Sequence, residues 1–160
     1  CQDNEISWFD WRDAAKNADF LEFVRKAIAF TRRFPVLQQR KFLLGRDLDA
    51  DGLPDIDWFG VDGAPPRWDD PELRTVCYRL ASGRRDGGDP ESLLFFVLNA
   101  DWRLQDVALP APGAARRWRR AVDTSLPAPD DFAAAREEIP LDPQDRYLMN
   151  ARSVVVLLGR

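Results

Sequence analysis

The densest chemistry in this 160-residue sequence lies within its first eleven residues. Asp3, Asn4 and Glu5 supply two carboxylates and an amide in a row, and such groups hydrogen-bond the hydroxyls of a sugar or another polyhydroxylated ligand. Trp8 and Trp11 follow, and flat aromatic rings either stack on such a ligand or anchor a loop in a core. The segment therefore predicts one wall of a binding site, with Asp3, Asn4, Glu5 and Trp8 as the candidate contacts. The alternative is a loop of solvated acids held by buried tryptophans.

No catalytic residue is assigned in this chain. The sequence has no histidine, which excludes Ser–His and Cys–His nucleophiles and every histidine-containing metal site. Glu5 and Asp10 are of the residue type that hydrolyses glycosidic bonds, but that chemistry depends on a fixed separation between two carboxyl groups. Their spacing in one short segment does not indicate such a separation.

An acidic segment further along the chain resembles part of a calcium site. Asp47, Asp49 and Asp51 alternate ahead of a glycine, which matches the first half of a calcium-binding loop. The second half does not match, because Trp58 stands at the twelfth position, where a bidentate glutamate belongs. We therefore expect an acidic surface turn with no metal and no other cofactor, and keep calcium at these three aspartates as the weaker alternative.

Charge and composition narrow the range of partners. The net charge of −4 argues against a nucleic-acid partner, although residues 116–120 hold four arginines around Trp118, which we expect in the core. No apolar run approaches the length of a membrane span, so we expect no membrane partner.

With only two cysteines in the chain, a disulfide framework is excluded and the cytoplasm is the expected compartment. Cys77 is expected to pack as a small apolar residue.

One helix is expected, over residues 19–34. Asp19 is its predicted N-cap, with Glu22 completing a box-like start, and Pro35 ends it at Phe34. Residues at spacings of three and four form its stripe toward a core: Phe20, Val24, Ala27, Ile28 and Thr31.

The rest of the chain is expected to be β-structure, dividing from the helical piece near residue 40. Short apolar or alternating runs with turn residues between them predict an antiparallel sandwich. The run at 92–100 is apolar at successive positions and predicts a strand buried on both faces, and residues 123–145 are expected to be irregular. The predicted strands are 55–61, 76–80, 92–100, 106–109, 118–122 and one long final strand at 147–158.

Beyond these patterns, the chain resembles a known family in several places. Its opening run, Cys-Gln-Asp-Asn-Glu-Ile-Ser-Trp with Asp10-Trp11 after it, is similar to the segment that follows the last barrel strand in bacterial glycogen debranching enzymes. These are isoamylase-like, glycogen-operon members of the α-amylase superfamily of glycoside hydrolases. Residues 32–37 resemble the end of that barrel's last helix, and residues 151–157 resemble the closing strand of the domain after it. The resemblance implies that 1–40 is the last loop and helix of a (β/α)8 barrel and that 41–160 is the C-terminal β-sandwich.

The same resemblance implies a function for the parent protein. Members of the family hydrolyse α-1,6-glucosidic branch linkages in glycogen with catalytic acids on earlier barrel strands, which are absent from this chain. We therefore expect the tail of a longer chain, structural or accessory and inactive by itself. Its expected partners are the rest of the barrel and the α-glucan substrate, in the cytoplasm.

Two other functions remain open for the piece itself. A non-catalytic carbohydrate-binding module would expose Trp and Tyr on one sheet face, and Trp68 and Trp102 are the candidates for such a surface glucan site. A purely structural β-domain would instead show an exposed apolar patch on the helix, along Phe20, Val24 and Ile28, where the barrel would sit.

Overall fold

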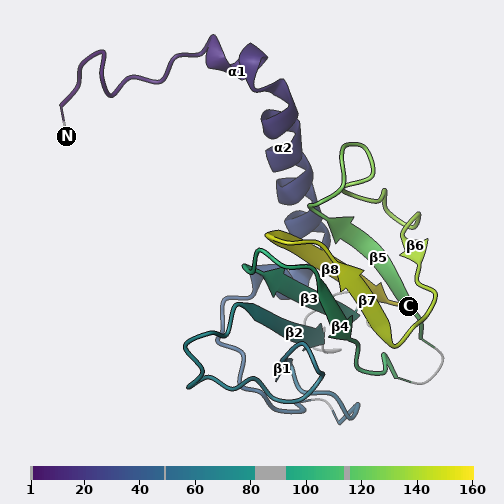
Figure 1. Ribbon diagram of the computed structural model, residues 1–160. Helices are drawn as coiled ribbons and strands as arrows, with labels where there is room; N and C mark the ends of the chain where they lie inside the picture. The colour runs from purple at the N-terminus through teal and green to yellow at the C-terminus, as the bar shows by residue number, and fades with distance from the viewer. Residues whose placement is uncertain (1, 49, 82–92, 114–115) are drawn as a thin grey trace.

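The computed structural model describes residues 2–48, 50–81, 93–113 and 116–160. Every strand pairing in the described residues is antiparallel, so the prediction of a mainly β, antiparallel fold is confirmed. The elements, shown in Figure 1, follow one another in this order: α1 (Asp13–Lys16), α2 (Ala18–Arg33), the 3-10 helix η1 (Pro35–Gln38), β1 (Ile56–Phe59), β2 (Thr75–Ala81), β3 (Leu93–Asn99), β4 (Gln105–Ala108), β5 (Trp118–Asp123), β6 (Ile139–Pro140), β7 (Arg146–Met149) and β8 (Ser153–Gly159).

Six strands form the larger sheet, in the order β1-β2-β3-β8-β5-β6, and β4 pairs with β7 in a two-stranded sheet. The two central strands are β3 and β8, and β3 pairs along its whole length with β2 on one side and with β8 on the other. Leu94 and Phe95 are both fully buried, on opposite faces of the sheet. The prediction that this run is a strand buried on both faces is therefore confirmed at Leu94 and Phe95, whereas Phe96 is half-buried and Leu98 is exposed further along.

The two-stranded sheet covers one face of the larger sheet. Val107 of β4 and Met149 of β7 pack with Phe95 and Trp118 in a single apolar core. Trp118 is fully buried, as expected, and its indole N–H donates to the carbonyl of Pro110 at 2.7 Å. This bond satisfies the one polar group that so large a side chain brings into the core.

The end of α2 and the 3-10 helix cover the other face. Phe34 and Val36 pack with Leu94 and Leu158 in a second apolar core. The helix ends where expected, because Phe34, which precedes Pro35, takes an extended conformation (φ −114°, ψ 104°), as the residue before a proline usually does.

The start of α2 differs from the expectation. The helix begins at Ala18 and Asn17 precedes it, without a side-chain cap, so Asp19 lies inside the first turn and its predicted role as N-cap is wrong. The physical reason is α1, whose single turn leads directly into α2: the backbone N–H and the side-chain amide of Asn17 both donate to the carbonyl of Asp13. Asp19 still lies at the positive end of the helix dipole.

Two strand predictions near the C-terminus are also wrong. The expected long strand at 147–158 is broken into β7 and β8 by a turn in which Arg152 takes φ 50°. The carbonyl of Asn150 accepts bonds from Ser153 Oγ and from the side chain of Asn99, and these bonds hold the turn. In addition, the region expected to be irregular contains the short strand β6, which pairs with β5.

The N-terminal residues extend away from the sheets. Figure 1 shows the chain before α1 running away from the β-strands, with only the later part of α2 beside the larger sheet. No helix within the described ranges is long and apolar enough to cross a membrane.

Candidate functional site

The candidate contacts at the N-terminus lie on one exposed turn. The carbonyl of Asn4 accepts the backbone N–H groups of Ser7 and Trp8 at 3.0 and 3.1 Å, which closes the turn. Across it, the indole N–H of Trp8 donates to Asp3 Oδ1 at 2.6 Å. The structure therefore brings Asp3 and Trp8 together, and the ring of Trp8 remains 63% exposed.

The other two candidates differ in how free their side chains are. The Asn4 side chain is engaged locally, since its Oδ1 accepts the N–H of Ile6 and its Nδ2 donates to Gln2 Oε1, both at 3.1 Å. Glu5 is exposed, and its carboxylate has no hydrogen bond or ion pair to any described residue. The turn can thus offer a free carboxylate and an aromatic face to a ligand, but it forms no enclosed site in this chain.

Asp10, the other acid of this segment, is held by an ion pair. Its carboxylate accepts two bonds from Arg12 Nε at 2.9 and 3.1 Å and one from Arg12 Nη2 at 2.7 Å. These bonds, with a further one from the backbone N–H of Arg12, lower the pKa of Asp10. A carboxylate stabilised in its ionised form is a poor general acid, so this contact gives no support to a catalytic pair with Glu5.

We call residues 2–12, the N-terminal segment before α1, the arm. An apolar groove of about 430 Å³ lies between the arm and the start of α2. Its aromatic walls include Phe9 and Trp11, whose rings meet edge to face at 5.2 Å, and Phe20. Trp11 is 81% exposed, so the alternative in which Trp8 and Trp11 are buried anchors is wrong for this chain. The arm presents its aromatics to solvent instead.

The acidic segment uses its carboxylates to hold its own backbone. Asp47 accepts the N–H groups of Asp51 and Gly52 at 3.2 and 2.9 Å, and Asp51 accepts that of Leu53 at 2.9 Å. Asp49 lies outside the described residues. Among the residues that are described, no three acidic or cysteine side chains converge as a metal site would require.

Trp68 and Trp102, the candidates for a surface glucan site, have separate neighbours. Trp68 meets Trp58 edge to face at 5.5 Å. Trp102 lies under the guanidinium groups of Arg74 and Arg103, at 5.0 and 5.8 Å. The sequence patterns did not point to Trp58 as a partner of Trp68, because that contact depends on how the loop after β1 folds back beside the strand.

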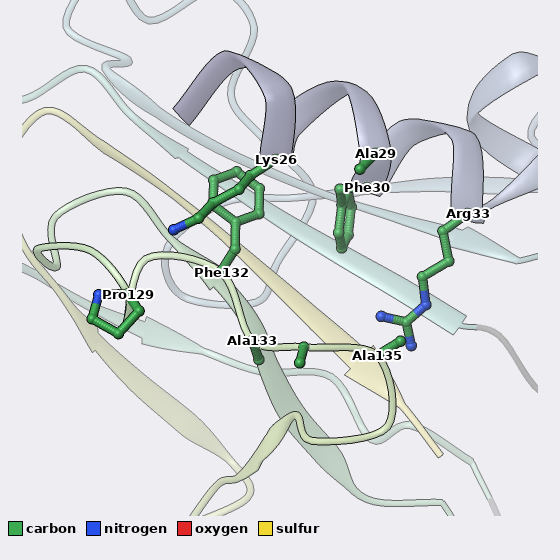
Figure 2. Close-up of a pocket in the computed structure, with 9 residues that line it drawn as sticks. Lys26, Ala29, Phe30, Arg33, Pro129, Phe132, Ala133 and Ala135 are labelled. Carbon is green, nitrogen blue, oxygen red and sulfur yellow. The ribbon is translucent and has the colours of Figure 1, made fainter. Parts of the chain in front are cut away.

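A second groove, of about 420 Å³, lies between α2 and the segment at 129–135, as Figure 2 shows. Its lining is mostly apolar and includes Phe30, Phe132 and four alanines, and Lys26 and Arg33 project from the helix beside it. Both cations are already paired: Lys26 with Asp131 at 2.7 Å, and Arg33 with Glu138. The charges at this groove therefore join the helix to the β-domain rather than await a ligand.

Cys77 is the one free thiol among the described residues and lies fully buried in β2. Burial raises the pKa of its thiol to about 12, which leaves it protonated and unreactive at neutral pH. The expectation that Cys77 packs as a small apolar residue is confirmed.

Comparison with known proteins identifies one matching family model and several relatives. The model, described as "Isoamylase, C-terminal", matches residues 55–158. The chain is 31% identical over 170 residues to a glycogen operon protein GlgX homolog of Mycobacterium tuberculosis, covering 98% of this chain and 22% of that protein. It is 27% identical over 164 residues to an isoamylase of Flavobacterium sp, covering 99% of this chain and 21% of that one. A glycogen debranching enzyme of Pectobacterium carotovorum is 33% identical over 87 residues, which is 52% of this chain and 12% of that protein. The chain thus spans about a fifth of the length of the first two relatives.

Proposed function

The chain belongs to the family of isoamylase C-terminal domains, and from this premise we propose that it is the accessory C-terminal part of a glycogen debranching enzyme. The parent enzyme would be a glycoside hydrolase that cleaves α-1,6-glucosidic branch linkages. The observation that carries the proposal is the family match over 55–158, together with relatives that are about five times longer.

The proposal assigns residues 1–40 to the end of a catalytic barrel and 41–160 to the β-sandwich. In support, α2 has an apolar face that no described element covers: Phe20 and Ile28 are 67% and 46% exposed, and Val24 between them is half-buried. The opposite side of the same helix packs on the sheet through Phe30, which touches Phe34 and Phe132. A helix with apolar side chains on both sides is what a position between a barrel and a sandwich would require.

Within the parent enzyme, Asp3, Asn4, Glu5 and Trp8 would form one wall of the glucan-binding cleft. Barrel enzymes build their sites from the loops at the carboxyl ends of the strands, and the arm would be one such loop. The exposed ring of Trp8 and the unpaired carboxylate of Glu5 support this role, because both are available to a sugar. The parent would act in the cytoplasm, with the rest of the barrel and the α-glucan as partners of this chain.

The chain by itself would not hydrolyse glycogen. Retaining hydrolysis needs two carboxyl groups about 5–5.5 Å apart across the scissile bond, and this chain supplies no residue that we assign to either role. The test is incubation of the purified 160-residue chain with glycogen, followed by assay of released linear chains and new reducing ends. We expect neither, and release of linear chains would contradict the proposed accessory role.

A second measurement tests the wall of the cleft. In the longer gene product that carries this chain, we expect Trp8→Ala and Glu5→Gln to raise KM for glycogen several-fold with kcat retained, since they touch substrate away from the reacting bond. Asp13→Asn, a change on the exposed turn α1, is the matched control and should leave KM unchanged. A longer product with no debranching activity at all would overturn the proposed parent function.

A further inference from the structure

Three aromatic side chains from neighbouring strands lie side by side on the larger sheet. Trp58 of β1 is opposite Tyr78 of β2, and Tyr78 is opposite Phe96 of β3, so all three project from the same face. Their ring centroids are 5.2 Å and 4.7 Å apart. Trp68 extends the row by meeting Trp58 at 5.5 Å. We call Trp68, Trp58, Tyr78 and Phe96 the aromatic strip.

The strip occupies a part of its face that the helices leave open. The same face is covered further along by Phe34 and Val36, which pack over its apolar centre. Trp58 is 40% exposed and Trp68 is 62% exposed, while Tyr78 is half-buried. The described chain therefore exposes a tryptophan pair and a tyrosine on one sheet face, the feature that a carbohydrate-binding role requires.

The polar atoms of the strip have no partners among the described residues. Neither the indole N–H of Trp58, nor that of Trp68, nor the hydroxyl of Tyr78 makes a hydrogen bond there. Elsewhere these groups are used: Trp118 donates to Pro110, and the hydroxyl of Tyr147 donates to Asp123 at 2.7 Å. If an apolar protein surface covered the strip and excluded water, these three hydrogen-bond donors would have no acceptor. A ligand that has both C–H faces and hydroxyls can pack its C–H groups against the aromatic rings while its hydroxyl oxygens accept hydrogen bonds from the three donors.

The angle between the tryptophan rings restricts the shape of the ligand. The planes of Trp58 and Trp68 are 78° apart, so the exposed end of the strip is a corner and not a flat platform. A β-1,4-linked glucan is a flat ribbon, which fits coplanar rings. An α-1,4-linked glucan curves, so that successive glucose units turn their faces in different directions, as the corner requires.

We propose that the aromatic strip is a surface binding site for α-glucan chains, separate from the N-terminal arm. One glucose face stacks on Trp58 or Trp68, and sugar hydroxyl oxygens accept the N–H and O–H groups of the strip. The choice of α-glucan rests on the proposed function, whereas the existence of a sugar site rests on the strip itself. The site would hold a glucan chain on the β-domain while another part of the parent enzyme acts on it.

Affinity electrophoresis of the 160-residue chain in native gels containing glycogen tests the proposal directly. We expect glycogen to retard the wild-type chain, and hydroxyethyl cellulose, a β-1,4-glucan, to leave its mobility unchanged. Trp58→Ala and Trp68→Ala should each weaken the apparent affinity for glycogen about tenfold. Tyr78→Phe, which removes one hydroxyl and keeps the ring, should weaken it by a smaller factor.

Matched variants separate the strip from other surfaces. Trp102→Ala removes a tryptophan of similar exposure elsewhere on the surface, 57% against 62% for Trp68, and should leave the retardation unchanged. Trp8→Ala is not a neutral control, because Trp8 belongs to the proposed cleft wall; it tests instead whether glycogen binds the arm. Circular dichroism of each variant checks folding, and Trp68, which lies in a loop, is the substitution least expected to disturb it.

Each possible result of the electrophoresis either supports or overturns the proposed site. Retardation that depends on Trp58 and Trp68 but not on Trp102 supports the site. Absence of retardation in the wild-type chain overturns it and leaves another protein segment or a second copy as the occupant of the strip. Retardation lost only with Trp8→Ala also overturns it, by placing the sugar on the arm. Because no hydrolysis is measured, a failed result here leaves the proposed parent activity intact.

Discussion

Lys26 Nζ lies 2.7 Å from Asp131 Oδ1, an ion pair between two residues 105 positions apart. Seven residues further along each segment, Arg33 pairs with Glu138, again across 105 positions. Both carboxylates are almost completely buried, with side chains 7% and 1% exposed. The two pairs therefore fix α2 against the segment that follows β5, two helical turns apart. We call these two pairs the helix clamp.

Removing one side of the clamp should destabilise the chain. Lys26→Met keeps much of the side-chain volume but leaves the buried carboxylate of Asp131 with the backbone N–H of Phe132 as its only hydrogen-bond partner among the described residues. We expect a loss of about 2 kcal/mol in the free energy of unfolding, measured by urea denaturation. Arg25→Met is the control: it removes an exposed pair with Glu22 at 3.6 Å on the same helix and should cost less than about 0.5 kcal/mol. Equal effects of the two variants would contradict the clamp.

The Arg33–Glu138 pair should make stability depend on pH. Burial alone would raise the pKa of Glu138, but hydrogen bonds from Arg33 and from backbone N–H groups outweigh it and lower the pKa below its usual value. A lowered folded-state pKa stabilises the fold above the unfolded-state pKa of about 4.3, and this contribution is lost as the pH falls through the folded-state pKa. The gap in unfolding free energy between the wild type and Glu138→Gln should therefore be widest near pH 7 and shrink below about pH 4.5. A gap that widens on acidification would refute this assignment.

Some parts of the fold followed from local sequence alone. The unbroken apolar run of β3 identified a strand with two buried faces, and the bond between Phe34 and Pro35 identified the end of α2. In both cases the deciding interaction is local: side-chain type at successive positions in one case, and a steric clash between adjacent residues in the other. Such signals do not depend on which distant segment packs against them.

The wrong predictions depended on distant contacts instead. The turn between β7 and β8 forms because Asn99, on another strand, binds the carbonyl of Asn150. The contact between Trp68 and Trp58 was likewise not predicted from the sequence. Neither contact is signalled by the residues next to it in sequence, because the first depends on strand order in the sheet and the second on how the loop after β1 folds.

Asn99 is expected to be one of the costliest polar residues to replace. Its Oδ1 accepts Thr75 Oγ1 and the N–H of Asp101, and its Nδ2 donates to the carbonyls of Arg103 and Asn150, all within 3.1 Å. Asn99→Ala removes four hydrogen bonds at once, including the buried bond to Thr75 Oγ1, and should lower the free energy of unfolding by about 3 kcal/mol. Asn99→Asp has the same shape but turns a carboxylate oxygen toward two carbonyls, so it should be no better tolerated.

The matched control for this substitution is in the same cluster. Asn150 is exposed, and its side chain donates one bond, to Ser125 Oγ. Asn150→Ala keeps the backbone carbonyl that Asn99 uses and should cost less than about 1 kcal/mol. If chemical denaturation shows Asn99→Ala to be as mild as Asn150→Ala, the proposed role of Asn99 in joining the strands is wrong.

The uncovered face of α2 should govern self-association. Phe20 and Ile28 contribute apolar surface to solvent, and such surface promotes association at high protein concentration. The double change Phe20→Ser with Ile28→Ser should reduce association measured by sedimentation velocity, at a cost to stability of less than about 1 kcal/mol. A large loss of stability in the monomer would instead show that this face is covered within the chain.

Cys77 should report global unfolding through its thiol. The buried side chain has a pKa raised to about 12 by desolvation, which lowers its thiolate fraction at pH 7 by about three orders of magnitude relative to an exposed thiol of pKa about 8.5. In a Cys1→Ser variant, a maleimide reagent should therefore label Cys77 only as fast as the chain opens. Because Cys77 lies in the core between the two sheets, the labelling rate should rise with urea in parallel with the loss of circular dichroism. Labelling of the native chain at the rate of a free cysteine peptide would mean that β2 opens without unfolding of the sheet, and that the burial of Cys77 does not protect it.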